Sequence, residues 1–302
     1  RYAPWWLAFI LLGALLKPML AWRMLRSESL AVESALAHSL QDGQAQLARL
    51  EAGLGGRLGV FAIDTADGAT VGHRADERFA MASSFKAILA AAVLERSLQT
   101  EGLMQRVVRY TERDLITHSP VAARHVAQGM TVADLCAATV QYSDNAAANL
   151  LMNVLGGPGA VTAFARAIGD TQFRLDRTEP ALNSAMAGDP RDTTTPQAMA
   201  HTLRKLVLGD ALPPPQRTQF TNWLLGNTTG AARIRAGVPA GWAVGDKTGT
   251  GHHGAASDIG VVWPPGRAPL VVVVYTWREA ADAKAREDVI ADATRVVVGW
   301  AA

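Results

Sequence analysis

The chain has 302 residues, of which 49% are hydrophobic and 19% charged, so it can bury a large core in one or two domains. Its formal net charge is only +2, and no cluster of Lys and Arg with interleaved aromatic residues occurs, so we expect no nucleic-acid partner. The one cysteine, Cys136, permits neither an internal disulfide nor a cysteine-based metal site, and the seven histidines are scattered. We therefore expect no metal and no other cofactor.

The first residues differ in kind from the rest. An uninterrupted apolar run, Trp5–Leu16, follows Arg1 and ends at Lys17. It is shorter than the about 20 apolar residues of a membrane-spanning helix and has the length of the hydrophobic region of a signal peptide. We expect residues 1–29 to be a signal peptide or, if the run extends through Met19–Trp22, an uncleaved membrane anchor. The expected location is periplasmic or secreted, with a membrane tether as the alternative.

A helix and a hairpin follow the leader. Leucines at helical spacing predict a helix within residues 30–50, which ends at the glycines that follow. Leu58–Ile63 and Ala69–His73 flank an Asp-Gly turn and predict two paired strands.

The middle of the chain, from Ala82 to Leu225, is rich in helical patterns and poor in strands. The predicted helices are Phe85–Leu98, Val121–Gln128, Val132–Tyr142, Ala146–Leu155, Val161–Ile168, Pro196–Leu208 and Pro215–Leu225. The stretch 177–192 has neither period and contains Pro180, Gly188 and Pro190, so it predicts an ordered loop.

Strands return near the end. Trp242–Gly249, Ala256–Trp263 and Leu270–Trp277 are predicted strands, and Ala280–Trp300 a closing helix. With strands at both ends, the simplest fold is α/β (α+β): a mostly antiparallel five-stranded sheet flanked by helices, with an inserted all-helical domain. We expect a discontinuous α/β domain from residues 30–81 and 226–302, and an all-helical domain over 82–225 that includes the loop 177–192. The active cleft should lie between the two.

Ser83 and Lys86 form a Ser-x-x-Lys tetrad at the start of a predicted helix. Residues three apart on a helix share one face, so the amine lies one turn from the hydroxyl and can take its proton. The hydroxyl also lies at the positive end of the helix dipole. Taken alone, the tetrad is a weak signal and is better explained by an N-cap serine and a solvated lysine.

Three further clusters change that interpretation. Ser143-Asp144-Asn145 lies in a turn between two predicted helices. Glu179 and Asn183 lie in the irregular loop, and Lys247-Thr248-Gly249 ends a strand, where a cation and a hydroxyl can meet a substrate carboxylate. Each cluster has an ordinary explanation, but all four in this order are not expected by chance.

The combination resembles the class A serine β-lactamases, over about Leu36 to Trp300. The flanking residues Gly226–Gly230 (GNTTG) and Gly245-Asp246 fit the same family. The resemblance implies the fold and activity of that family, a β-lactam antibiotic as the partner and, with no partner chain indicated, a monomer.

The resemblance also implies a role for each matching residue. Ser83 is the nucleophile that forms the acyl-enzyme, and Lys86 or Glu179 takes its proton, a choice that the sequence leaves open. Ser143 passes a proton to the departing lactam nitrogen, and Glu179 holds the deacylating water with Asn183. The substrate-binding residues are Asn145, Asn183, Lys247, Thr248, Gly249, Thr250, Arg233 and His118, and the amides of Ser83 and Thr250 form the oxyanion hole.

Two features of the loop 177–192 are implied by the same resemblance. The Glu179–Pro180 peptide bond should be cis, a form that X-Pro bonds reach at low cost. Arg177 and Asp192 should pair and close the loop, so that loss of one partner loosens the segment that carries Glu179.

The sequence departs from the family pattern at several positions. Ala90 leaves Cys136 without the disulfide partner of many members, and Ala82 and Gly251 replace a cysteine pair of many carbapenem-hydrolysing members. Ala256 stands where some members bind the carboxylate with arginine, and Arg233 resembles the substitute that others use. Thr250 has a hydroxyl where some members have alanine, which hints at cephalosporin turnover, and His118 takes the place of an aromatic residue that walls the cleft.

Two alternatives differ in what they require. A penicillin-binding DD-peptidase shares the serine, lysine and Lys-Thr-Gly motifs but lacks a positioned deacylating acid, so Glu179 with Asn183 argues for the β-lactamase. A silent sensor domain on a membrane anchor fits the apolar N-terminus, but it gives no reason for the intact Ser83, Lys86, Glu179 and Lys247.

Overall fold

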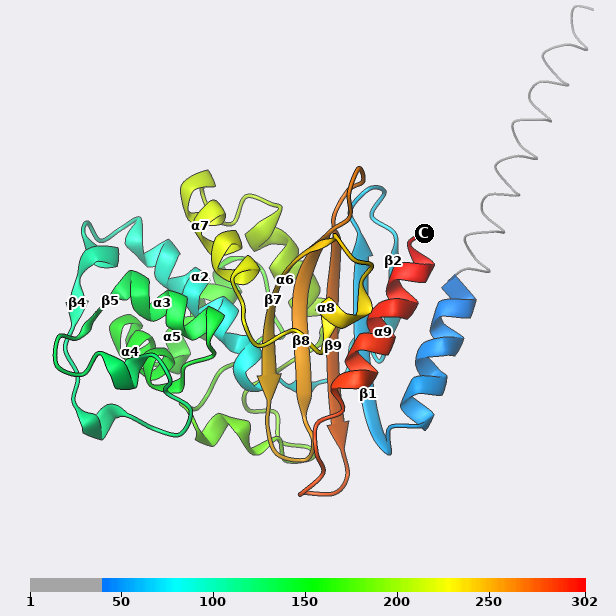
Figure 1. Cartoon of the computed structure of the whole chain (residues 1–302), viewed down its shortest axis with the longest axis horizontal. Coiled ribbons are helices and arrows are strands. Elements are labelled where there is room, and N and C mark those ends of the chain that lie inside the picture. The colour runs from blue at the N-terminus through cyan, green and yellow to red at the C-terminus, as the bar shows by residue number, and fades with distance from the viewer. Residues whose placement is uncertain (1–39) are drawn as a thin grey trace, which may run out of the picture.

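The computed structural model describes residues 40–302 (Figure 1). The predicted signal peptide or anchor, residues 1–29, lies outside this range. Within the range, no helix combines the length and the apolar character that a bilayer crossing requires.

A five-stranded sheet forms the centre of one half of the molecule, and every neighbouring pair in it is antiparallel, in the order β2-β1-β9-β8-β7. The strands are β1 (Gly56–Asp64), β2 (Thr70–His73), β7 (Ala243–Thr250), β8 (Ala256–Trp263) and β9 (Leu270–Arg278). This confirms the predicted antiparallel sheet built from both ends of the sequence. The edge strand β7 carries the Lys-Thr-Gly motif.

The central strand β9 shows why the sheet is covered on both sides. Alternate side chains of a strand point to opposite faces. In β9 the buried residues alternate between two separate cores: Val271, Val273 and Tyr275 belong to one, and Val272 and Val274 to the other. A strand that is apolar at every position needs helices on both faces.

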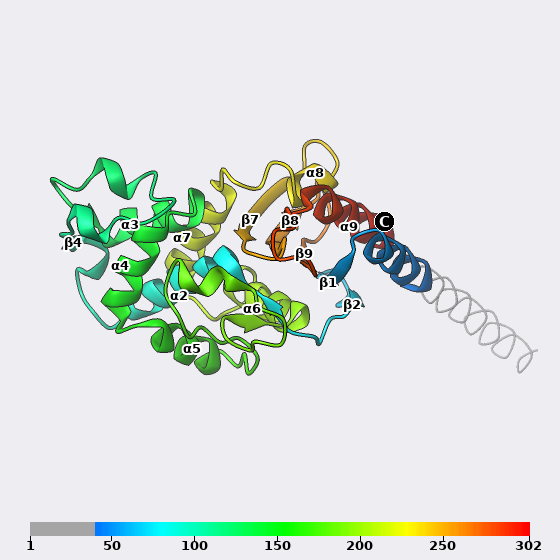
Figure 2. The ribbon, with the colours of Figure 1, turned by 90° about the horizontal axis from the view of Figure 1, so that it is seen from below.

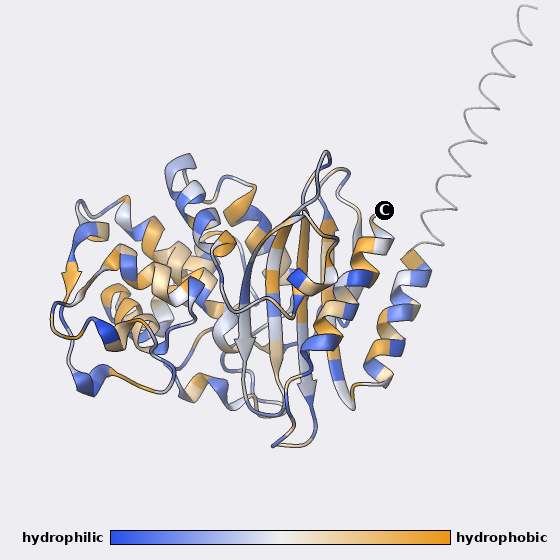
Figure 3. Ribbon diagram, viewed as in Figure 1, coloured by the Kyte–Doolittle hydropathy of each residue, from blue (hydrophilic) through white to orange (hydrophobic). Residues whose placement is uncertain are grey.

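Helices from both ends of the chain cover the outer face. Residues 40–52 are helical and lie beside α9 (Glu287–Trp300), as Figures 1 and 2 both show. On the inner face α6 (Pro196–Val207) packs across β9, β1 and β8. The hydrophobic colouring of the strands in Figure 3 follows this double cover. The division of domains at residues 81/82 and 225/226 stays a prediction.

The helical half is built around α2 (Phe85–Ser97), whose residues Phe85–Leu94 are all buried. A helix that is apolar on all sides needs neighbours on all sides. Those neighbours are α3 (Val132–Gln141), α4 (Asn145–Leu155), α5 (Pro158–Ala167) and α7 (Pro214–Leu225). Lys86 is the one charged residue in the buried part of α2, and a buried charge of this kind needs a partner within the protein.

Several short elements complete the fold. β3 (Phe79–Ala80) pairs with β6 (Thr193–Thr194), β4 (Val107–Val108) pairs with β5 (Met130–Thr131), and α8 (Ile234–Gly237) is a single turn. The 3₁₀ turns are η1 (Ala82–Ser84), η2 (Leu103–Gln105), η3 (Glu112–Asp114), η4 (Ala122–Arg124) and η5 (Ala181–Ser184).

Two helix predictions are wrong in part. The predicted helix Val121–Gln128 is only the 3₁₀ turn η4, because the buried Asp144 carboxylate accepts the Val121 and Ala122 amides at 2.9 Å and fixes the chain there. The closing helix begins at Glu287 rather than Ala280. The preceding residues form turns against β9, and Arg278 donates to the Lys284 carbonyl.

Glu51 joins the N-terminal helix to the first hairpin. Its carboxylate accepts from Arg74 Nε (2.6 Å) and Nη2 (2.8 Å) and from the Leu58 amide (2.9 Å), and it lies 3.1 Å from His73 Nε2. Burial acts to raise the pKa of Glu51, but the hydrogen bonds from Arg74, Leu58 and His73 outweigh it and lower the pKa to about 2.

The first prediction concerns Glu51→Gln. Because the folded-state pKa is depressed, the carboxylate stabilises the fold above its unfolded value near 4.5, and this stabilisation is lost as pH falls towards 2. We expect the variant to lose about 1–2 kcal/mol at pH 7 and to converge with the parent at acid pH in urea unfolding. Glu95→Gln, whose carboxylate accepts only from Gln99 on the surface, is the control. A pH-independent difference would contradict the assignment.

Candidate active site

Ser83 lies in the 3₁₀ turn η1, directly before α2. Amides in the first turn of a helix have no partner within that helix, so the Ser83 N–H is available to a ligand. Contacts of the next residue hold the turn in place: Ser84 Oγ donates to the Met81 carbonyl at 2.8 Å and lies 3.3 Å from the Tyr275 hydroxyl. Strand β7 packs against it so closely that a Cβ on Gly249 would lie 2.5 Å from the Met81 carbonyl oxygen. Only glycine fits there.

Glu179 brings Ser83 and Lys86 together. The Ser83 hydroxyl donates to Glu179 Oε1 at 3.2 Å, and Lys86 Nζ lies 3.0 Å from the same oxygen. The side chains of Lys86 and Glu179 are both fully buried. Lys86 also donates to the Ser143 carbonyl at 2.7 Å and to Asn145 Oδ1 at 2.5 Å. The lysine from α2 therefore links the loop 177–192 to the turn before α4.

Burial lowers the pKa of the Lys86 ammonium from its ordinary value, and the charge of Glu179 acts in the opposite direction. An amine with a lowered pKa gives up its proton more readily and can then accept one from a neighbouring hydroxyl. The arrangement thus places two potential proton acceptors beside Ser83.

The turn of Ser143, Asp144 and Asn145 has an unusual backbone. Ser143 has φ +56°, a left-handed conformation that residues other than glycine adopt at some cost in strain. Asp144, fully buried, caps α4 by accepting the Ala147 amide at 2.9 Å, so the turn is held from within the protein. The Ser143 hydroxyl lies 3.5 Å from Lys86 Nζ.

Lys247 reaches the same point from β7. Its Nζ donates to Ser143 Oγ at 3.0 Å and to the Thr248 carbonyl at 2.7 Å. Burial, and next the charge of Lys86, lower the pKa of Lys247 well below its ordinary value. Ser143 Oγ therefore lies between two lysines, since Lys86 Nζ is 3.5 Å away on the other side.

Residues that the sequence interpretation gave no role support this edge of the site. Thr229 Oγ1 lies 2.5 Å from Thr248 Oγ1 and donates to Asn227 Oδ1, and the Asn227 amide donates to Asp246 Oδ2 at 2.7 Å. A Cβ on Gly230 would lie 1.9 Å from that Asp246 oxygen, so glycine is required. The Gly226–Gly230 segment, noted only as a flanking match, holds the strand end through this chain of contacts.

Asn149 is a second residue without a predicted role. Its side chain accepts the Glu179 amide at 3.0 Å and donates to the Glu179 carbonyl at 2.9 Å, so α4 clamps the backbone of the loop at the acid itself. Asn149 follows Asn145 by one helical turn and shares its face, which is the signal that could have found it. Asn183 donates to Glu179 Oε2 at 2.5 Å, and the Glu179–Pro180 bond is cis, as predicted.

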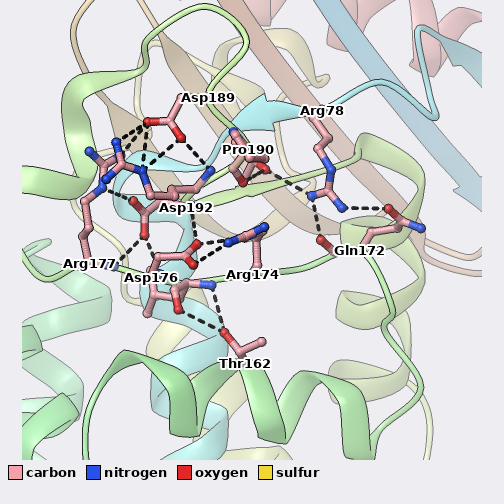
Figure 4. Close-up of polar contacts among 12 residues, drawn as sticks. Arg78, Thr162, Gln172, Arg174, Asp176, Arg177, Asp189, Pro190 and Asp192 are labelled. Carbon is pink, nitrogen blue, oxygen red and sulfur yellow. Dashed lines mark hydrogen bonds and ion pairs between the residues drawn. The ribbon is translucent and has the colours of Figure 1, made fainter.

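Figure 4 shows how the loop 177–192 closes. Arg177 Nε donates to Asp192 Oδ2 at 2.5 Å, and Asp192 Oδ1 accepts the Asp176 and Arg177 amides. Asp192 is only 1% exposed. The predicted pair is therefore present, with one partner buried.

Arg233 lies behind β7 and uses its donors on its own chain. It donates to the carbonyls of Gly249 and Ser257, both at 2.8 Å, and to Thr250 Oγ1 at 2.7 Å, and it is paired with Glu287. It is 4% exposed, so its contact with the cleft runs through the Thr250 hydroxyl.

His118 is exposed and has a left-handed backbone conformation, with φ +63°. Its ring nitrogen Nε2 lies 3.0 Å from the Tyr142 carbonyl, and its own carbonyl accepts the Asn145 amide. The loop that carries His118 therefore borders the turn of Ser143.

Among residues 40–302, no group of three or more histidine, cysteine or acidic side chains is placed to hold a metal ion. Cys136 is a free, buried thiol in the helical half. A Cβ on Gly251 would lie 3.7 Å from Ala82 Cβ, so these positions are adjacent, as they are where other members have a disulfide.

Comparisons with known proteins identify the family of this chain. The model of the β-lactamase enzyme family matches residues 43–301. The chain is 58% identical over 252 residues to the carbapenem-hydrolysing β-lactamase KPC of Klebsiella oxytoca, covering 83% of this chain and 86% of that protein. It is 56% identical over 256 residues to the β-lactamase CTX-M-8 of Citrobacter amalonaticus, covering 85% and 88%.

A solved structure shares the fold. The crystal structure of a β-lactamase from Desulfarculus baarsii superimposes with a TM-score of 0.86 at 56% identity, covering 87% of this chain and 98% of that chain. The chain therefore belongs to the β-lactamase enzyme family. Within that family it is a class A serine β-lactamase, a hydrolase of cyclic amides of the kind that confers antibiotic resistance.

The second prediction concerns the closure of the loop 177–192. Arg177→Gln leaves the Asp192 carboxylate buried with only backbone donors, so we expect a loss of about 2 kcal/mol in urea unfolding. Arg174→Gln removes the same charge from the partly exposed Arg174–Asp176 pair and should cost less than about 1 kcal/mol. Equal losses in the two variants would show that the Arg177–Asp192 pair does not hold the loop.

Proposed function

We propose that this protein hydrolyses penicillins and cephalosporins through an acyl-enzyme on Ser83, and that Glu179 with Asn183 positions the water that releases the product. The observation that carries the proposal is the position of one oxygen. Glu179 Oε1 lies 3.2 Å from the Ser83 hydroxyl and 3.0 Å from the Lys86 amine, while Asn183 holds the other carboxylate oxygen.

In the proposed acylation step, Ser83 Oγ attacks the lactam carbonyl carbon and the ring C–N bond breaks. The serine proton passes to Lys86 or to Glu179: Glu179 accepts directly from the hydroxyl, and Lys86 contacts the same carboxylate oxygen. Amides of Ser83 and Thr250 bind the oxyanion that forms, and each such donor typically contributes roughly 3–4 kcal/mol to lowering the barrier. Ser143, between the two lysines, gives a proton to the departing nitrogen and is reprotonated from Lys86 or Lys247.

In the proposed deacylation step, a water held by Glu179 and Asn183 attacks the ester carbon. Glu179 takes a proton from this water and returns it to Ser83 Oγ as the Ser83–acyl bond breaks, which restores the serine hydroxyl. A water at hydrogen-bond distance from both Ser83 Oγ and Glu179 Oε1 is compatible with their separation of 3.2 Å.

The proposed substrate contacts follow from the edges of the cleft. Lys247 and Thr248 bind the substrate carboxylate, with Gly249 allowing the backbone to approach. Asn145 bonds the side-chain amide of the substrate. Thr250, held by Arg233, and His118 border the region where substrates of different classes diverge.

Two further proposals concern the setting. The apolar run Trp5–Leu16 supports export to the periplasm or secretion, with an uncleaved tether as the alternative. We also propose that the protein acts as a monomer, as the family resemblance implies.

The third prediction separates this function from that of a DD-peptidase. Purified protein should turn over a chromogenic cephalosporin many times per enzyme, because Glu179 supplies a route to deacylation. Ser83→Ala, which removes only the nucleophilic oxygen, is the control and should lose this activity. A single stoichiometric burst would favour the peptidase. Rates over penicillins, cephalosporins and carbapenems then define the spectrum.

The fourth prediction isolates the role of Glu179. Glu179→Ala should still acylate but deacylate about 10²–10⁴-fold more slowly, because the water loses its base. Intact-protein mass spectrometry should then show an adduct equal to the mass of the drug. Glu112→Ala, which removes an exposed carboxylate, should show no adduct. Failure of Glu179→Ala to accumulate the ester would remove Glu179 from deacylation.

A further inference from the structure

A cavity of about 400 Å³ lies between the tip of the loop 177–192 and the strands β3 and β9. The lining does not include Ser83, Glu179 or Lys247, so the cavity is separate from the candidate active site. Its walls are Arg57, Glu77, Arg78, Phe79, Ala80, Arg177, Thr193, Trp277 and the loop residues 185–191.

The charged part of the lining is basic. Four arginines face one glutamate and one aspartate, so the lining has a formal charge of +2. Arg177 pairs with Asp192, Arg191 pairs with Asp189, and Arg57 pairs with Glu77. Three of the four arginines therefore have a carboxylate partner.

Arg78 is the arginine in this lining without a carboxylate. Its guanidinium donates to the Gln172 carbonyl (2.8 Å), Gln172 Oε1 (3.0 Å) and Thr193 Oγ1 (3.1 Å), all of them neutral acceptors, as Figure 4 shows for Gln172. Within residues 40–302 it forms no ion pair. Guanidinium groups bind carboxylates, sulfonates and phosphates in preference to neutral acceptors. Arg78 is thus a fixed cation at the wall of a cavity that holds an excess of positive charge.

Apolar side chains make up another part of the lining. Phe79, which is buried, and Trp277 come from the strands, and Met186, at the tip of the loop, is 58% exposed. The Trp277 ring is held in place, because its Nε1 donates to the Ala185 carbonyl at 2.8 Å. An exposed apolar side chain beside fixed polar groups is typical of a small-molecule site.

We propose that this cavity is a binding site for an aryl anion, a small aromatic molecule that carries a carboxylate or sulfonate. The anion lies against Arg78 and Arg191, and the ring lies against Trp277 and Met186. The volume is within the range of cavities that hold one small ligand.

Binding there acts on the loop that carries Glu179. An anion beside Arg191 competes with Asp189, the carboxylate that Arg191 shares with Arg177, and so disturbs the contacts that close the loop. Turnover then falls. This kinetic consequence rests on the proposed function of Glu179, whereas the binding itself does not.

The test uses 2-naphthalenesulfonate and the full chain in isothermal titration calorimetry, with uncharged 2-naphthalenemethanol as the comparison ligand. We expect one site for the sulfonate and at least about tenfold weaker binding in Arg78→Gln and in Arg191→Gln. Arg174→Gln makes the same change beside the cavity without lining it, and Lys247→Ala removes the cation of the cleft. Both should bind as the parent does. Circular dichroism melts check that each variant is folded.

Several results would overturn the proposal. These are absence of binding, equal binding by the alcohol, retained binding in both cavity variants, or lost binding in Lys247→Ala, which would place the ligand in the candidate active site.

In turnover of a chromogenic cephalosporin, the sulfonate should lower kcat without raising KM. Competitive inhibition would again place it in the cleft, and an unchanged kcat with the cavity occupied would refute the link to the loop. Because calorimetry does not depend on turnover, it tests the proposed binding site even if the proposed function is wrong.

Discussion

The structure depends on one buried ion pair. Lys86 and Glu179 have no exposed side-chain surface, and each charge is tolerated in the interior only because the other lies 3.0 Å away and further hydrogen bonds satisfy both. The pair joins α2, which is buried from Phe85 to Leu94, to the mostly irregular loop 177–192. Because removing either partner leaves an uncompensated charge, the fold and the position of the acid are set by the same interaction.

Other contacts of the site hold Lys86 and Glu179 in place. Asn149 holds the loop backbone on both sides of the Glu179 residue, and Asp192 closes the loop behind it. From the opposite wall Gly249 lets β7 approach the turn of Ser83, which brings a second lysine to Ser143. These contacts come from an amide side chain, from a glycine, from the Arg177–Asp192 ion pair and from Lys247, each of which fixes the position of one neighbouring group.

The sequence allowed much of this arrangement to be predicted, for identifiable reasons. The strands of the sheet follow from β-branched runs, and Phe85–Leu98 from an apolar helical run without breakers. Ser83, Lys86, Ser143 and Lys247 stand in short motifs, and their convergence follows from the resemblance of the whole set. Other features depend on distant partners and have no local pattern. The turn at Ala122 is set by Asp144, the late start of α9 by contacts with β9, and the position of Arg233 behind β7 by Thr250 and Glu287. Asn149 was visible in principle, one turn after Asn145, but nothing in the sequence ties it to Glu179.

The single cysteine of the sequence, Cys136, bears on the redox conditions under which the protein can fold. The only sulfhydryl of the chain is packed inside the helical half, and burial raises the pKa of this thiol. Relatives that have a second cysteine depend on the redox state of their surroundings to complete the cross-link, whereas this protein reaches its native state with no oxidative step. Its maturation is therefore indifferent to thiol reductants, and the shielded sulfur offers no point of attack for alkylating or oxidising agents as long as the helices around it stay closed.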